Sequence, residues 1–108
     1  MEDQYNRIED YLYNSHKVSH AIIRECARLC QENAIPLVVA GIYADPLTRE
    51  MLDYCGHEGF PGVDISVDLR LQENSCLPSD PHPSAIANRR FADKLEAFLA
   101  KSRAIQIN

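Results

Sequence analysis

The residues with the clearest potential for chemistry form the hexapeptide Ser79-Asp80-Pro81-His82-Pro83-Ser84. Asp80 and His82 stand two residues apart, in a segment that Pro81 and Pro83 stiffen. A carboxylate can fix the tautomer and orientation of an imidazole, which can then act as a general base. The spacing therefore predicts a catalytic pair in which Asp80 orients His82. A simpler interpretation also fits, in which Asp80 caps the next helix and His82 is a surface loop residue.

The four cysteines do not have the spacing of a metal site. Cys26 and Cys30 are separated by four residues on the apolar stripe of a predicted helix, which favours buried thiols in a core. The other residues whose side chains could bind a metal in such a site are Cys55, His57 and Cys76. Because these residues lack the paired short spacings of a zinc module, we expect no metal.

Two further pairs are weaker candidates. His16 and His20 have a spacing that can ligate a metal on a helix, but no His-Glu-x-x-His arrangement accompanies them. We expect a solvated or half-buried helix start there. Asp64 and Asp68 bracket a predicted strand end and can either line a cleft or simply face solvent. The glycines fit no phosphate-binding spacing, so we expect no cofactor.

Composition limits the classes of protein. The chain has 108 residues, 45% hydrophobic and 25% charged, which is typical of one small globular domain. A net charge of −5 argues against a nucleic-acid surface, and no apolar run reaches the length of a membrane span. The N-terminus lacks the basic and apolar regions of a signal peptide. We therefore expect a soluble, cytoplasmic chain with reduced thiols.

Helical periodicity dominates the first third of the chain. Residues 1–15 predict a short helix or an N-terminal arm, and residues 16–34 predict a helix that ends at Asn33, before Pro36. The apolar residues at helical spacing in the first segment are Tyr5, Ile8, Tyr11 and Leu12. Those in the second are Val18, Ile22, Cys26, Leu29 and Cys30.

The rest of the chain alternates strands and helices. Residues 36–43 are apolar on both faces, as in a buried parallel strand, and residues 63–69 alternate as a second strand. Between them, Asp45 and Pro46 begin a helix that we expect to end at Gly56. A loop over residues 72–84 leads to a final helix over 84–101. The residues that this helix is expected to bury are Ala87, Phe91, Leu95, Phe98 and Leu99.

This order predicts an α/β fold with about two parallel strands and three main helices, arranged as part of a three-layer doubly wound sheet. Two strands leave exposed edges, and the first strand is apolar all round. We therefore expect a larger sheet. Either the chain is a fragment that lacks an N-terminal segment, or a homo-oligomer completes the sheet.

The residues from about 16 to 101 resemble the C-terminal part of the SGNH (GDSL-type) hydrolases. The main resemblance is the run Leu77-Pro-Ser-Asp-Pro-His-Pro-Ser-Ala-Ile-Ala-Asn-Arg-Arg-Phe-Ala-Asp-Lys-Leu. Residues 32–46 and 62–69 are similar to the strand units that precede that block. The resemblance implies a flavodoxin-like, SGNH-type sheet, with His82 as catalytic base and Asp80 as the acid that orients it. Ser84, Ala87 and Asn88 stand where that family commonly has Asn, Gly and His.

The family's nucleophile block, Gly-Asp-Ser, and its oxyanion-hole blocks have no counterpart in these 108 residues. A Gly-x-Ser-x-Gly elbow is missing as well. The resemblance implies an ester substrate for the full-length context, whereas the chain by itself is expected to have little or no esterase activity. The alternative is a non-catalytic α/β remnant or a dimeric interaction module.

Overall fold

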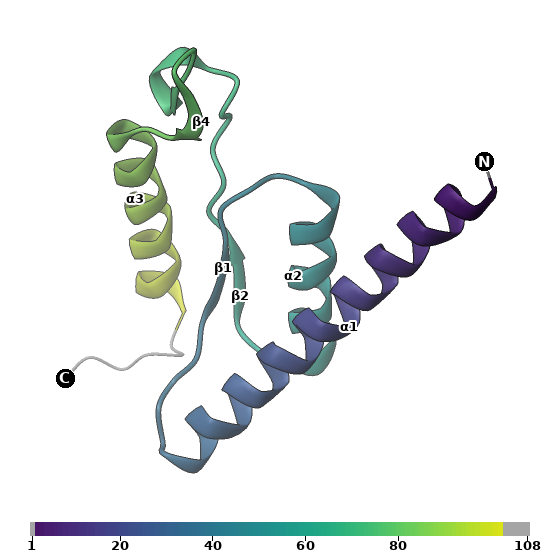
Figure 1. Cartoon of the computed structure of the whole chain (residues 1–108). Coiled ribbons are helices and arrows are strands. Elements are labelled where there is room, and N and C mark those ends of the chain that lie inside the picture. The colour runs from purple at the N-terminus through teal and green to yellow at the C-terminus, as the bar shows by residue number, and fades with distance from the viewer. Residues whose placement is uncertain (1, 103–108) are drawn as a thin grey trace. The chain divides into compact units, whose positions relative to one another are not determined.

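The structure is a computed structural model that describes the backbone of residues 2–102 and the side chains of Asn14 and of residues 16–102. The chain divides into two compact units, Met1–Leu37 and Val38–Asn108, and each is described by itself. The described residues form a mixed α/β protein with three α-helices, a parallel pair of strands and an antiparallel pair (Figure 1).

The first unit is built on one helix, α1, which spans Glu2–Glu32. The segment predicted as a short helix or an arm is therefore helical, and it continues without a break into the helix predicted from residue 16. After Glu32, the Asn33 side chain donates a hydrogen bond of 2.7 Å to the Leu29 carbonyl, and Pro36 follows. The end of the helix thus agrees with the prediction. The predicted stripe of Tyr5, Ile8, Tyr11 and Leu12 lies outside the described side chains.

The apolar stripe of α1 is more exposed than the sequence predicts. Val18 and Ile22 are each 58% exposed, Cys26 is exposed and Cys30 is half-buried. The prediction of two buried thiols is therefore wrong for Cys26. The physical reason is that the described part of this unit holds no second helix or strand, and a single helix cannot bury its own stripe.

In the second unit, β1 (Val39–Gly41) and β2 (Gly62–Asp64) pair in parallel, as predicted. Their register aligns Val39 with Gly62 and Gly41 with Asp64. Both strands are shorter than the predicted 36–43 and 63–69. β2 ends early because Asp64 Oδ1 accepts a hydrogen bond of 2.9 Å from the backbone N–H of Ser66, which turns the chain. β1 ends where its partner does.

Helix α2 (Pro46–Glu58) joins the two strands. It begins as predicted, because Asp45 accepts a hydrogen bond from the Thr48 backbone N–H and Pro46 occupies the first turn. The prediction that Gly56 ends it is wrong. Gly59 adopts the left-handed conformation, with φ of 81°, and closes the helix three residues later.

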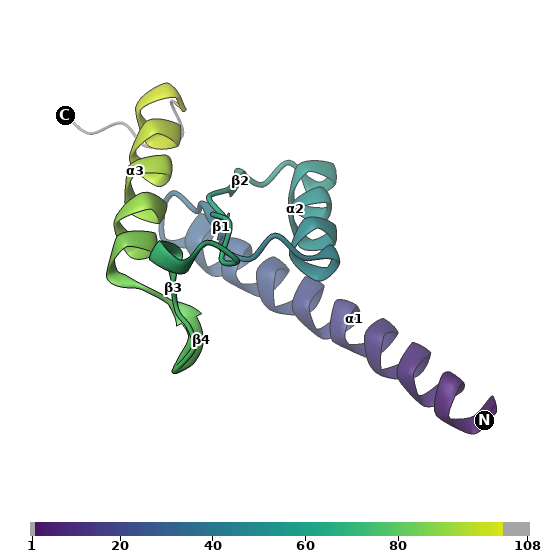
Figure 2. The same ribbon diagram turned by 90° about the horizontal axis from the view of Figure 1, so that it is seen from above.

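The strand pair has a helix on each face. A Cβ placed on Gly41 or Gly62 would meet Leu52 of α2, so these glycines face α2. Val63 alternates to the opposite face, where it packs against the core cluster. That cluster contains Ile65 of the segment after β2 together with Ala87 and Phe91 of the final helix. Figure 2 shows the strand pair between α2 and α3.

Helix α3 (Ala85–Lys101) matches the predicted 84–101 to within one residue, with Ser84 as its N-cap. Of the residues predicted to be buried by this helix, Ala87 and Phe91 are buried, whereas Leu95, Phe98 and Leu99 are half-buried. The segment before it is more ordered than the predicted loop. A short 3-10 helix, η1 (Gln72–Asn74), leads into β3 (Ser75–Cys76), which pairs antiparallel with β4 (Asp80–Pro83).

Candidate functional site

Asp80 and His82, the pair expected from the sequence, lie together at the two sides of Pro81 on β4. Asp80 Oδ1 accepts a hydrogen bond of 2.8 Å from the His82 backbone N–H and also contacts Nδ1 of the His82 ring. The backbone bond and then the ring bond hold the pKa of Asp80 below its ordinary value. Asp80 therefore remains a carboxylate at neutral pH.

The imidazole is accessible in this position. The His82 side chain is 75% exposed and that of Asp80 is 49% exposed. In the tautomer that donates Nδ1–H to Asp80, the other ring nitrogen, Nε2, carries the lone pair. Among the described side chains, Asp80 is the one that is hydrogen-bonded to this ring. The arrangement can thus accept a proton at Nε2 from a group that approaches the exposed face.

The strand that carries the pair is fixed at both of its ends. Pro83 aligns with Ser75 and Asp80 aligns with Cys76, so Pro81 and His82 form an irregular bulge between these two positions. The next residue, Ser84, donates its hydroxyl hydrogen bond to the Glu73 carbonyl, at 2.5 Å. The same oxygen accepts from the Ala87 backbone N–H and caps α3. The bulge aims the imidazole outward from a short, anchored strand.

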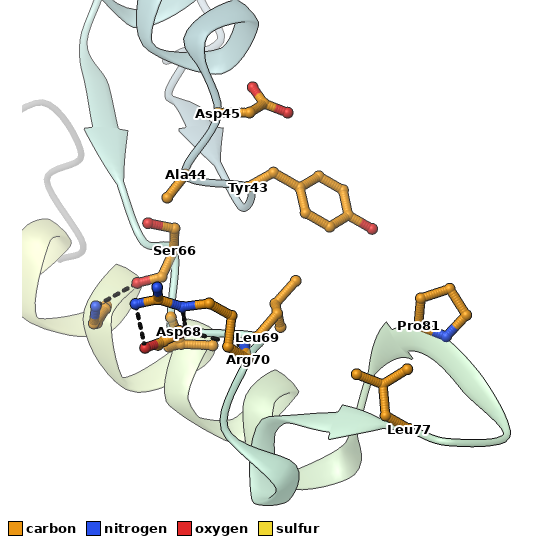
Figure 3. A pocket seen from close by; sticks show the side chains of 11 residues that line it. Tyr43, Ala44, Asp45, Ser66, Asp68, Leu69, Arg70, Leu77 and Pro81 are labelled. Carbon is orange, nitrogen blue, oxygen red and sulfur yellow. Dashed lines mark hydrogen bonds and ion pairs between the residues drawn. The ribbon is translucent and has the colours of Figure 1, made fainter.

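A pocket of about 800 Å³ lies in the second unit, where β1 and β2 end (Figure 3). Its lining comes from residues 43–45 after β1, residues 66–70 after β2, Leu77 and Pro81 of the hairpin, and Lys94 of α3. The carboxyl ends of parallel strands are where open α/β sheets bind ligands. Pro81 joins the pocket to the predicted pair, because it lies between Asp80 and His82, which themselves are not lining residues.

Charged groups in the pocket are mostly paired. The Arg70 guanidinium donates to both carboxylate oxygens of Asp68, at 2.9 and 3.1 Å, and the Arg70 backbone N–H adds a bond of 3.0 Å. The Arg70 side chain, followed by its backbone N–H, lowers the pKa of Asp68. The Lys94 ammonium donates to the Ser66 carbonyl. Lys94 thus contributes a positive charge that its hydrogen-bonded partner does not neutralise.

Sequence reasoning identified only part of this pocket. Asp68 was considered as a cleft residue and does line the pocket, whereas Asp64 is not part of the lining. Tyr43, Ser66 and Lys94 were missed as pocket residues. For Tyr43 and Ser66 the available signal was their place just beyond predicted parallel strands, since strand ends of this kind meet at one edge of a sheet.

The weaker candidates are not among the residues that line this pocket. His16 and His20 stack on α1 with their ring centroids 6.5 Å apart, and both are half-buried, as expected, but they lie inside the helix and not at its start. In the second unit, Cys55 is fully buried and burial raises the pKa of its thiol, whereas Cys76 is exposed. Among the described residues, no three His, Cys, Asp or Glu side chains come together as a metal site would need.

The comparisons with known proteins add no relative. No family model matches the chain, and neither the curated proteins nor the solved structures contain a significant match. Within residues 2–102, no helix has both the length and the apolar character needed to cross a membrane.

Proposed function

We propose that this chain carries the acid–base end of a serine-type ester-hydrolase active site, of the class represented by the SGNH (GDSL-type) hydrolases. Asp80 is the orienting carboxylate and His82 is the general base. The observation that supports this most directly is the contact between Asp80 Oδ1 and His82 Nδ1. The pair also adjoins, through Pro81, a pocket at the ends of two parallel strands.

The proposal extends to the fold. In a flavodoxin-like sheet, parallel strands are joined by helices and covered by helices on both faces. The parallel pair β1–β2, the connecting helix α2 and the covering helix α3 supply one such unit. In the proposed enzyme, this unit forms one side of a larger doubly wound sheet, and further strands bring the nucleophile to the same edge.

The proposed chemistry uses His82 twice. Its Nε2 takes the proton from a serine hydroxyl while that oxygen attacks the ester carbonyl, and the imidazolium then protonates the leaving alcohol. An acyl-enzyme remains, which water hydrolyses by the same proton transfers in the second half-reaction. Asp80 keeps Nδ1–H directed toward itself and stabilises the imidazolium that forms in each half.

By this proposal the 108-residue chain lacks turnover when alone, because its sequence contains no Gly-Asp-Ser block. A histidine–aspartate pair can only accept a proton from a nucleophile that is present. Loss of a triad member lowers the rate by several orders of magnitude, and oxyanion donors supply much of what remains. The chain and its His82→Ala variant are therefore expected to hydrolyse 4-nitrophenyl esters equally slowly.

The decisive experiment reads the natural transcript upstream of Met1 and expresses the polypeptide that continues in frame through this chain. We expect an upstream strand followed by Gly-Asp-Ser, and hydrolysis of 4-nitrophenyl butyrate. His82→Ala should lower kcat about 10³-fold or more, and Asp80→Asn at least about 10²-fold. His57→Ala is the matched control, because His57 is an exposed residue of the last turn of α2.

Two outcomes would overturn the proposal. One is an upstream region that encodes no strand followed by Gly-Asp-Ser, together with a rate of ester hydrolysis that is the same for the chain and its His82→Ala variant. The other is an active longer polypeptide whose kcat is the same in the His82→Ala and His57→Ala variants.

A non-catalytic interaction module is the second candidate, and one observation favours it. In the described residues, β1 and β2 pair only with each other, so each has an outer edge without a strand partner. A module of this kind would pair an edge with another copy. Light scattering on the purified chain tests this idea: a stable, well-folded monomer at high concentration would argue against it.

A further inference from the structure

The pocket has chemically different ends. Figure 3 shows Ser66, Asp68 and Arg70 gathered at one end, and Leu77 and Pro81 at the other. Lys94 belongs to the polar end, because its ammonium is hydrogen-bonded to the Ser66 carbonyl. A ligand with a polar group at one end and an apolar body would match this division.

The middle of the pocket is apolar and accessible. The side chains of Tyr43 and Leu69 lie between the two ends in Figure 3. Tyr43 is 40% exposed and Leu77 is 46% exposed, so both present apolar surface that a ligand can cover. A volume of about 800 Å³ is within the range of small-molecule sites.

The polar end contains one cation, Lys94, that has no direct ion pair among the described side chains. Arg70 neutralises Asp68, and Asp45 uses its carboxylate to cap α2. Lys94 is exposed, and its positive charge acts on the nearby Asp64 carboxylate, whose pKa it helps to lower, but among the described side chains no carboxylate forms a direct ion pair with it. Its hydrogen-bonded partner is a neutral carbonyl. The ammonium therefore has donors left for a ligand carboxylate or phosphate oxygen.

We propose that this pocket selects an ester with an anionic group far from the ester bond, held by Lys94 at the polar end. The apolar spacer lies along Tyr43 and Leu77, and the ester lies at the Pro81 end, one residue along the chain from His82. The inference rests on the proposed function for the position of the ester. The anion site itself does not depend on hydrolysis, so it can be tested in the chain alone.

The test compares two probes of nearly the same size on the ¹⁵N-labelled 108-residue chain. Monoethyl adipate carries a carboxylate, and diethyl adipate is its neutral counterpart. Titration followed by NMR should show tighter binding of the monoester, with shifts at Tyr43, Ser66 and Leu77. Lys94→Met should weaken monoester binding about fivefold and leave the diester unchanged, because one partly exposed ion pair is lost.

Two further variants keep the result interpretable. Lys94→Arg retains the positive charge and should retain monoester selectivity, which separates charge from folding. Lys101→Met removes an exposed lysine from the last turn of α3 and should change neither affinity. Equal affinities for the two probes, or equal effects of Lys94→Met and Lys101→Met, would overturn the anion site. If the chain binds the monoester selectively but His82→Ala does not change kcat of the longer polypeptide, the proposed function is overturned and the anion site is not.

Discussion

The guanidinium of Arg90 on α3 donates a hydrogen bond of 2.5 Å to the side-chain oxygen of Asn74, which is only 1% exposed. The Asn74 amide in turn donates to the Asp68 carbonyl, at 2.9 Å. Asn74 therefore links the final helix, the 3-10 turn before the hairpin and the segment that lines the pocket. The hairpin that carries His82 depends on this buried amide for its position.

Replacing Asn74 by Ala should destabilise the chain by about 2 kcal/mol, because it leaves the Asp68 carbonyl and the Arg90 guanidinium without this partner. Urea denaturation followed by circular dichroism gives the free energy of unfolding. Asn88→Ala is the control, since Asn88 is exposed on α3 and the substitution there should be near neutral. A difference below about 0.5 kcal/mol between the variants would show that the buried amide contributes little.

Gly56 inside α2 and Gly59 at its C-cap should respond in opposite directions to the same substitution. Gly59 has φ of 81°, so Gly59→Ala forces a left-handed alanine and should cost about 1 kcal/mol. Gly56 lies inside α2, and a Cβ there meets no atom within 4 Å. Gly56→Ala should therefore stabilise the chain by about 0.5–1 kcal/mol. Thermal melts of the two variants check this, and a shift of the same sign in both would contradict the assigned helix end.

The thiols of the second unit should differ in reactivity. Cys55 is fully buried and its pKa is raised by burial, whereas Cys76 is exposed. Since the thiolate is the reactive form, iodoacetamide should alkylate Cys76 at least about tenfold faster than Cys55. Peptide mass spectrometry at several times measures both rates. In denaturing urea the alkylation rates of Cys55 and Cys76 should become equal. Equal rates in the absence of urea would mean that the fold does not protect Cys55 from alkylation.

The chain should lose stability in acid. Among the described residues of the second unit, four aspartates that accept hydrogen bonds have lowered pKa values: Asp45, Asp64, Asp68 and Asp80. An aspartate in an unfolded chain has a pKa of about 3.9, so the contribution of these four carboxylates to the free energy of unfolding is fully present above that pH. It is lost as the pH falls through the lower folded-state values.

Urea midpoints between pH 7 and pH 2 measure this dependence, and they should be flat above about pH 5 and fall below about pH 4. Asp45→Asn should make the acid fall shallower, because the neutral amide still caps α2 but no longer titrates. Asp53→Asn, on the exposed face of the same helix, should leave the slope nearly unchanged. A flat profile down to pH 2 would contradict the lowered pKa values.

The order of the main elements could be predicted from local signals in the sequence. Asp45 followed by Pro46 marks a helix start through one hydrogen bond and one fixed φ, and both are local properties. Phe91 and Leu95 mark the core face of α3 by their spacing. The end of α2 was misplaced because Gly56 and Gly59 are equally permissive, and the choice between them depends on the turn that follows.

The hairpin and the pocket could not be predicted in this way. Pro81 and Pro83 cannot donate backbone hydrogen bonds, so a segment that contains them carries the pattern of a loop rather than a strand. The contact of Asp80 with His82 was expected, because two residues of separation suffice for it. Lys94 reaches Ser66 across 28 positions of sequence, and this pairing follows only from packing α3 on the strand pair.

The double role of the Ser84 hydroxyl limits which substitutions this position can accept. The hydroxyl oxygen accepts from the Ala87 backbone N–H while its O–H donates to the Glu73 carbonyl, so the side chain must do both at once. Threonine and asparagine meet that requirement, whereas ionised aspartate can only accept and alanine can do neither. Only a small set of residue types can therefore replace Ser84 and keep both hydrogen bonds. A saturation library scored for folding should reveal that set directly.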